Sequence, residues 1–188
     1  MSSTDASPAT VSRSDASPDG GRGTVVVGTT LDAPPAAIWQ AVNTPAAFRF
    51  VTQGLVSLDG VDAIDTWGPG ATVAGRLRVL GVPFSRHRIT VESIDDDRRA
   101  LQSDEAGGPI RSWRHLITVD EVPGDPDRCR YTDRIEIDAG ILTPGIAAFA
   151  HVFYRTRQRR WRSLAPVLAA VHDDAGQDDP APSGDAGR

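Results

Sequence analysis

Residues 110–119, IRSWRHLITV, have the alternation of apolar and polar side chains that is typical of a half-buried strand. Successive side chains of a strand point to opposite faces of its sheet, so Trp113, His115 and Ile117 share one face and Arg114 lies on the other. A histidine among apolar neighbours is either a hydrogen-bonded core residue or part of a site. The run therefore predicts a strand whose covered face carries one titratable side chain.

Four further runs of this kind surround it, near residues 71–80, 84–94, 98–105 and 128–138. The turn-prone segments LGVP, DDD, AGGP and VPGDPD separate the runs, which predicts an antiparallel meander with one exposed and one covered face. The expected exposed face carries Arg76, Arg78, Arg86, Arg88, Arg114, Arg130 and Arg134. The expected covered face carries Val73, Leu77, Val79, Ile89, Val91, Trp113, Ile117, Tyr131, Ile135 and Ile137.

The segment after the last run, residues 143–172, has the apolar spacing of an amphipathic helix that covers the sheet. We expect Pro166 to kink or end this helix near Arg162. The predicted apolar stripe consists of Ile146, Phe149, Ala150, Phe153, Trp161, Leu164 and Leu168. Arg157 falls inside that stripe, whereas most arginines of the run 155–162 face the other way. We interpret that run as a solvated face in preference to a nucleic-acid site.

The meander is preceded by a strand and two short helices. Residues 24–34, TVVVGTTLDAP, are rich in β-branched side chains and predict a strand. Residues 34–54, PPAAIWQAVNTPAAFRFVTQG, predict two helices that are broken at Asn43-Thr44-Pro45. The expected fold is therefore α+β: a strand, two short helices, a curved antiparallel sheet and a long C-terminal helix lying across it.

Residues 1–22 and 173–188 are poor in apolar side chains and rich in Ser, Asp, Pro and Gly, so we expect two disordered tails around one domain at 23–172. The chain carries a net charge of −5, and the C-terminal tail, with five Asp and one Arg, supplies most of it. The near-neutral domain argues against a nucleic-acid partner. We find no signal-peptide pattern and no membrane-spanning run, and we expect a cytoplasmic location.

Three stretches resemble the START-like or SRPBCC superfamily, the helix-grip fold of pollen allergens, lipid carriers and polyketide cyclases. TTLDAPPAAIWQAVNTPAAF is similar to the opening strand and helix of that family, WGPGATVAGRLRVLGVP to its central hairpin, and HVFYRTRQRRWRSLA to its closing helix. The resemblance implies a cavity between helix and sheet that accepts hydrophobic small molecules. It implies no particular reaction, because the fold hosts carriers, sensors and enzymes.

Folding each hairpin about its turn predicts which inward polar residues pair across the strands. His115 is expected opposite Asp133, His87 beside Glu105, and Glu105 beside Arg111. Two clusters result, about 13 Å apart along the strands, so we expect no shared metal site. We interpret His87, Glu105 and Arg111 as a salt-bridge cluster at the rim. The pair of His115 and Asp133 is either an internal hydrogen bond or a general base with its orienting partner.

The leading hypothesis is a protein that binds a hydrophobic or aromatic small molecule without a cofactor. The alternative is an enzyme of the polyketide cyclase or dehydratase type, in which His115, oriented by Asp133, moves a proton while Tyr131 or Arg157 binds a carbonyl or enolate oxygen. A third interpretation is an interaction module that uses the acidic tail or the arginine-rich helix. The expected ligand-binding residues are His87, Ile89, Trp113, His115, Tyr131, Asp133, Phe149, Phe153 and Arg157, with His115 and Asp133 as catalytic candidates and no metal ligand.

Overall fold

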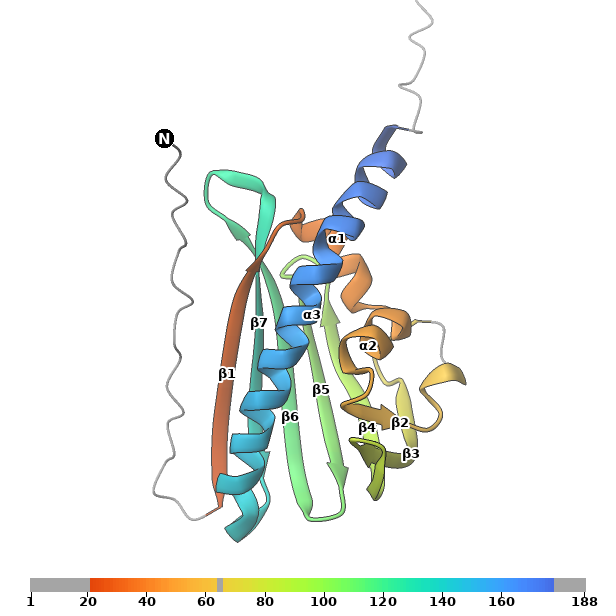
Figure 1. The fold of residues 1–188 in the computed structure, drawn as a ribbon, viewed down its shortest axis with the longest axis vertical. Helices are drawn as coiled ribbons and strands as arrows, with labels where there is room; N and C mark the ends of the chain where they lie inside the picture. Colours follow the sequence, from red (N-terminus) through yellow and green to blue (C-terminus); the bar gives the residue numbers. More distant parts are fainter. Residues whose placement is uncertain (1–20, 64–65, 178–188) are drawn as a thin grey trace, which may run out of the picture.

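The computed structural model of the protein describes residues 21–63 and 66–177. Seven strands form one antiparallel sheet in the order β1-β7-β6-β5-β4-β3-β2, and a long helix lies across it (Figure 1). The strands are β1 (Arg22–Leu31), β2 (Val56–Leu58), β3 (Thr72–Val79), β4 (Val82–Asp95), β5 (Ala100–Gly107), β6 (Ile110–Val122) and β7 (Asp125–Asp138). The helices are α1 (Pro35–Val42), α2 (Pro45–Thr52), α3 (Thr143–Gln177) and the 3₁₀ turns η1 (Val61–Ala63) and η2 (Gly140–Leu142). The predicted order of elements is confirmed.

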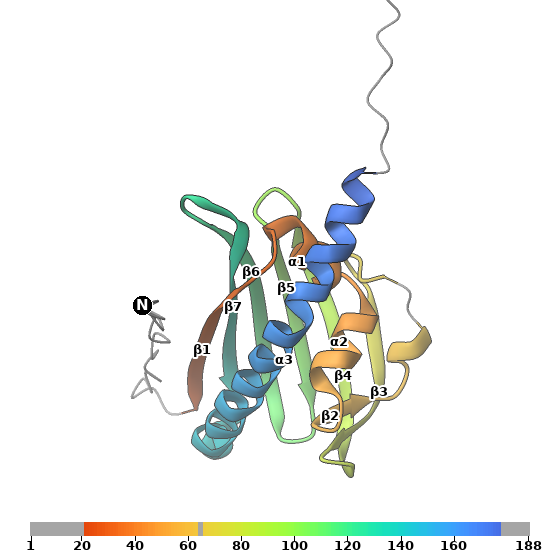
Figure 2. The ribbon, with the colours of Figure 1, turned by 45° about the horizontal axis from the view of Figure 1, so that its top comes forward.

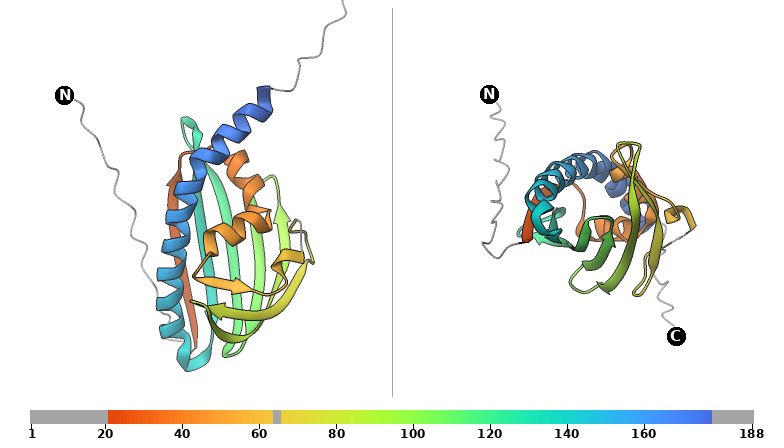
Figure 3. Two further views of the ribbon diagram at one scale, coloured as in Figure 1. Left: turned by 45° about the vertical axis from the view of Figure 1, so that its right-hand side comes forward. Right: turned by 90° about the horizontal axis from the view of Figure 1, so that it is seen from below.

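The sheet curls around α3, which runs along its concave side, while α1 and α2 close one flank (Figures 2 and 3). The break between the two short helices lies where the sequence predicts it. Thr44 is the N-cap of α2, and its hydroxyl accepts a hydrogen bond from the Ala47 N–H at 3.2 Å. Pro45 then occupies the first turn, where its missing N–H costs nothing.

The two predicted faces of the sheet are confirmed. Val73, Tyr131 and Ile135 are examples of the inward set and are buried, whereas Arg88 and Arg134 of the outward set are exposed. The predicted pairing of residues is wrong, because every estimated register is displaced by two. His115 lies opposite Ile135, Glu105 opposite Trp113, and His87 opposite Gly107.

The positions of the turns and the β-bulges beside them together account for the displaced registers. The pairing shifts between Glu121 and Val122, between Glu105 and Gly107, and between Val91 and Ser93. The β4–β5 turn is itself centred later than the estimate, since Asp95 pairs with Ala100, and between Glu121 and Val122 the partner on β7 jumps from Cys129 to Asp125. Folding the sequence symmetrically about its turn therefore cannot find the partners. A displacement of two residues keeps every side chain on its predicted face.

Helix α3 is 35 residues long and is rotated relative to the prediction. Its buried stripe is Ala150, Tyr154, Arg157, Gln158, Trp161 and Ala165. Phe149, which was expected in the stripe, is 42% exposed, and Phe153 is half-buried. The Gln158 amide donates a hydrogen bond of 2.6 Å to the Val27 carbonyl oxygen, so a polar side chain is accommodated at the interface. An apolar stripe alone could not reveal this rotation.

The ends of the folded part also differ from the prediction. Pro166 lies inside α3 and does not end it, because the Arg162 carbonyl that loses its partner is on the exposed side of the helix. Residues 173–177, which were expected in the C-terminal tail, belong to α3. Residues 1–20 and 178–188 of the expected tails lie outside the described residues. No helix of the described part is long and apolar enough to cross a membrane.

Candidate functional site

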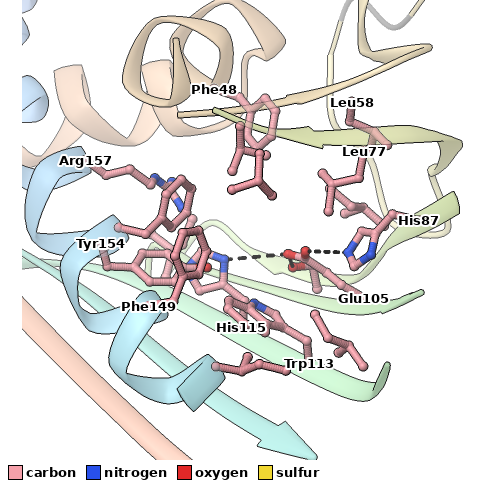
Figure 4. Close-up of a pocket in the computed structure, with 18 of the residues that line it drawn as sticks. Phe48, Leu58, Leu77, His87, Glu105, Trp113, His115, Phe149, Tyr154 and Arg157 are labelled. Carbon is pink, nitrogen blue, oxygen red and sulfur yellow. Dashed lines mark hydrogen bonds and ion pairs between the residues drawn. The ribbon is translucent and has the colours of Figure 1, made fainter. Parts of the chain in front are cut away.

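A pocket of about 340 Å³ lies between α3 and the concave face of the sheet. Strands β3 to β6 form its floor, and α3 forms the opposite wall (Figure 4). Most of the lining is apolar or aromatic, including Phe48, Trp67, Trp113, Phe149, Phe153, Tyr154 and Trp161. The polar lining side chains are few: His87, Ser103, Glu105 and His115 from the sheet, and Arg157 from α3.

Glu105 on β5 stands at the centre of these polar groups. His87 Nε2 on β4 lies 3.4 Å from one of its oxygens, and the Ser103 hydroxyl donates to the other at 3.4 Å. His115 Nδ1 on β6 lies 4.0 Å from that second oxygen (Figure 4). The two predicted clusters are therefore one group spread over three adjacent strands. Arg111 does not belong to it, because its exposed guanidinium lies 3.7 Å from Asp138.

Asp133 holds the other side of the His115 ring. Its carboxylate is 0% exposed and lies 2.9 Å from His115 Nε2. The Tyr131 hydroxyl donates to the same oxygen at 3.0 Å, and the Gln158 amide donates to the other oxygen at 3.4 Å. Since a carboxylate only accepts, Nε2 carries the hydrogen of this contact, and Nδ1 is the ring nitrogen that faces Glu105. The buried contact of His115 and Asp133 fits both sequence interpretations.

Arg157 is a buried cation at the edge of this group. It is 4% exposed, and its guanidinium lies over the Tyr154 ring at 4.9 Å and near the Phe153 ring at 5.8 Å. Its Nη1 lies 4.0 Å from an Asp133 oxygen. Burial alone lowers the pKa of Arg157, but the surrounding phenols and carboxylates outweigh it and raise that pKa above its ordinary value. The guanidinium therefore stays charged.

Tyr131 is placed differently from the prediction. Both Tyr131 and Asp133 are fully buried behind the wall and do not line the pocket. Burial, followed by the charge of Asp133, raises the pKa of the Tyr131 phenol well above its ordinary value, so the phenol stays protonated and serves as a donor. These two residues orient His115 from behind.

The other predicted ligand-binding residues all line the pocket: His87, Ile89, Trp113, His115, Phe149, Phe153 and Arg157. The sequence interpretation missed Tyr154 and Trp161, which line it from α3. Trp161 was in the predicted apolar stripe but was not expected to bind the ligand. Tyr154 lies on the same helical face as Ala150 and Trp161, and this spacing could have found it if polar residues had been allowed in the stripe. Among the described residues, no group of three or more His, Cys, Asp or Glu is arranged to hold a metal ion.

The fold is similar to several solved structures. Truncated norcoclaurine synthase from Thalictrum flavum has a TM-score of 0.58 and 12% identity, over 80% of this chain and 97% of that chain. The same enzyme has been solved in complex with dopamine and hydroxybenzaldehyde. Protein CV1439 from Chromobacterium violaceum has a TM-score of 0.59 and 11% identity, over 76% and 96% of the two chains. Ara h 8.0201 has a TM-score of 0.52 and 11% identity, over 76% and 99%.

These structures are helix-grip proteins, and the likeness confirms the predicted START-like fold without showing a function. No curated protein matches the sequence. A family model described as "Domain of unknown function (DUF8410)" matches residues 29–164, which is more than half of the chain. The chain therefore belongs to the DUF8410 family, and it has the helix-grip fold of the START-like superfamily.

Proposed function

We propose that the protein binds a hydrophobic or aromatic small molecule in the pocket between α3 and the sheet, as a carrier or sensor without a cofactor. The observation that carries this proposal is the lining, which is largely aromatic and aliphatic with a few polar groups. Small-molecule sites typically combine an apolar concave surface with a small number of placed polar groups. The complex of norcoclaurine synthase with dopamine and hydroxybenzaldehyde supports small aromatic ligands for this fold.

The proposal includes a cytoplasmic location and no nucleic-acid partner. The arginines of α3 support the second point, because several of them are used within the protein. Arg157 is buried, Arg160 donates to the Val51 carbonyl oxygen at 3.0 Å, and Arg162 donates to the Thr29 hydroxyl at 3.1 Å. These side chains are not a free basic face.

Naphthalene is a suitable first probe, and we expect it to bind in the pocket. In an NMR titration, shifts should concentrate on β4, β5, β6 and the facing part of α3. Ile89→Trp fills the pocket and should weaken binding at least tenfold, whereas Arg88→Ala, on the opposite face of the same strand, should change it less than twofold. Overpacking a core lowers the free energy of unfolding by about 1–3 kcal/mol. Backbone spectra should therefore be recorded to verify that both variants fold. Equal binding by wild type and Ile89→Trp would contradict the proposal.

A second candidate is an enzyme of the polyketide cyclase or dehydratase type. The observation in its favour is the orientation of His115, whose Nε2 is held by Asp133 while Nδ1 faces the pocket beside Glu105. A ring fixed in this way can accept a proton at Nδ1. Arg157 lines the pocket and can bind a carbonyl or enolate oxygen, whereas Tyr131 lies behind the wall and is withdrawn from this role.

His115→Gln separates the two candidates. Gln can still donate to Asp133, so we expect the fold to survive, but it cannot act as a base. If the protein is an enzyme, native mass spectrometry and organic extraction should find a different bound molecule in the variant, related to the wild-type one by the mass of the reaction. If the protein only binds its ligand, both should hold the same molecule. A variant that loses marked stability and keeps the same ligand would make His115 a packing residue.

A further inference from the structure

Arg157 has no hydrogen-bond partner that accounts for its burial. A guanidinium has five N–H donors and no acceptor. Within the described residues, none of these donors makes a hydrogen bond, and the buried Nε has no partner at all. The nearest carboxylate oxygen, on Asp133, is 4.0 Å from Nη1, which is beyond hydrogen-bond distance. Buried polar groups in proteins are nearly always paired, so this side chain calls for an acceptor.

Asp133 is already occupied by other donors. Its two oxygens accept hydrogen bonds from His115, Tyr131 and Gln158. A small movement of Arg157 toward Asp133 would therefore compete with three existing contacts. The acceptor that Arg157 lacks is more readily supplied from the pocket, which Arg157 lines.

The position of the guanidinium suits recognition. It lies against the Tyr154 and Phe153 rings, which hold its plane through cation–π contacts. Figure 4 shows Arg157 and Tyr154 extending from α3 on the side of the pocket opposite His87. An oriented donor loses little further conformational freedom when a ligand binds.

The charges around the pocket favour an uncharged acceptor. The Asp133 carboxylate lies 4.0 Å from Arg157 Nη1 and already faces the guanidinium as a countercharge. An anionic ligand would place a second negative charge beside that carboxylate in a region of low dielectric. A carbonyl oxygen accepts from the guanidinium without adding charge.

We propose that Arg157 is the hydrogen-bond donor for an uncharged aromatic ligand that carries a carbonyl oxygen. This inference rests on the proposed binding function and names the ligand class of the same pocket. The aromatic part of the ligand packs on the tryptophans and phenylalanines of the lining, and the carbonyl oxygen meets the guanidinium.

Two probes of similar shape test the inference. 2-Acetylnaphthalene carries a carbonyl group, and 2-ethylnaphthalene has a methylene group in its place. Calorimetric titrations give the affinity of each for the wild type, for Arg157→Met and for the control Phe149→Leu, which alters the apolar lining. We expect Arg157→Met to weaken the ketone about tenfold relative to the hydrocarbon, since hydrogen bonds to charged groups are worth at least that factor. Phe149→Leu should change both affinities by the same factor.

The outcomes separate this inference from the proposed function. If neither probe binds to the wild type, the proposed function fails and the inference falls with it. If both bind and Arg157→Met changes them equally, only the assignment of Arg157 is overturned.

A measurement on the wild type covers the case in which Arg157→Met does not fold. The Nε–H resonance of Arg157, assigned by its absence in Arg157→Lys, should shift further when the ketone is added than when the hydrocarbon is added. The same response to both probes would overturn the inference.

Discussion

Replacing Asp133 by Asn is expected to destabilise the protein by about 3–5 kcal/mol, the usual cost of removing one member of a buried charged group. The side chain is 0% exposed, and its oxygens accept from His115, Tyr131 and Gln158. The Asn side chain has only one acceptor oxygen, so its NH₂ group faces at least one of these three donors. The substitution also removes the carboxylate that pairs with the Arg157 guanidinium at 4.0 Å.

Urea unfolding followed by circular dichroism measures this loss, and Glu136→Gln on the same strand is the matched control. Glu136 is on the exposed face and pairs with Arg134 at 3.2 Å. Exposed ion pairs contribute at most about 1 kcal/mol, so the control should stay within that range. If Asp133→Asn lowered the free energy of unfolding as little as the control does, the stability of the protein would not depend on the charge of Asp133.

Trp161→Ala is the second change with a large expected effect, also about 3–5 kcal/mol. Trp161 is 2% exposed, and its ring lies 5.2 Å from that of Tyr131. It packs α3 against the core that α1, α2 and the sheet share. Removing the indole enlarges the pocket and separates the helix from the sheet at one end.

Thermal and urea unfolding give the size of this effect, with Val167→Ala as the control on the same helix. Val167 is 58% exposed, so its truncation should cost less than about 1 kcal/mol. If the two variants lost the same amount, α3 would be anchored elsewhere and the assignment of its buried face would be wrong.

Local patterns in the sequence predicted the elements and their faces. Alternation along IRSWRHLITV and its neighbours predicted which side of each strand is covered, and Asn43-Thr44-Pro45 predicted the break between α1 and α2. These features depend on periodicity and on residue-specific backbone preferences, which act over a few residues. The estimated registers were displaced by two residues, yet the faces were correct, because a strand repeats every two residues.

The contact of His115 with Asp133 was also predicted, although the two residues are not opposite each other. His115 lies opposite Ile135, and Asp133 is its diagonal neighbour on β7. Diagonal neighbours on one face remain within reach of long side chains, so the pair forms in either register.

Only the tertiary structure decided how the polar residues meet. In the observed registers Glu105 is the diagonal neighbour of both His87 and His115, so that two expected clusters are one. The rotation of α3 depends on polar side chains, since the sheet offers Gln158 the Val27 carbonyl and places Asp133 near Arg157. Bulges and buried polar contacts arise between segments that are distant in the chain. Their free energy depends on partners that no local pattern contains, and for that reason the sequence by itself determined the faces while the assembled fold determined the site.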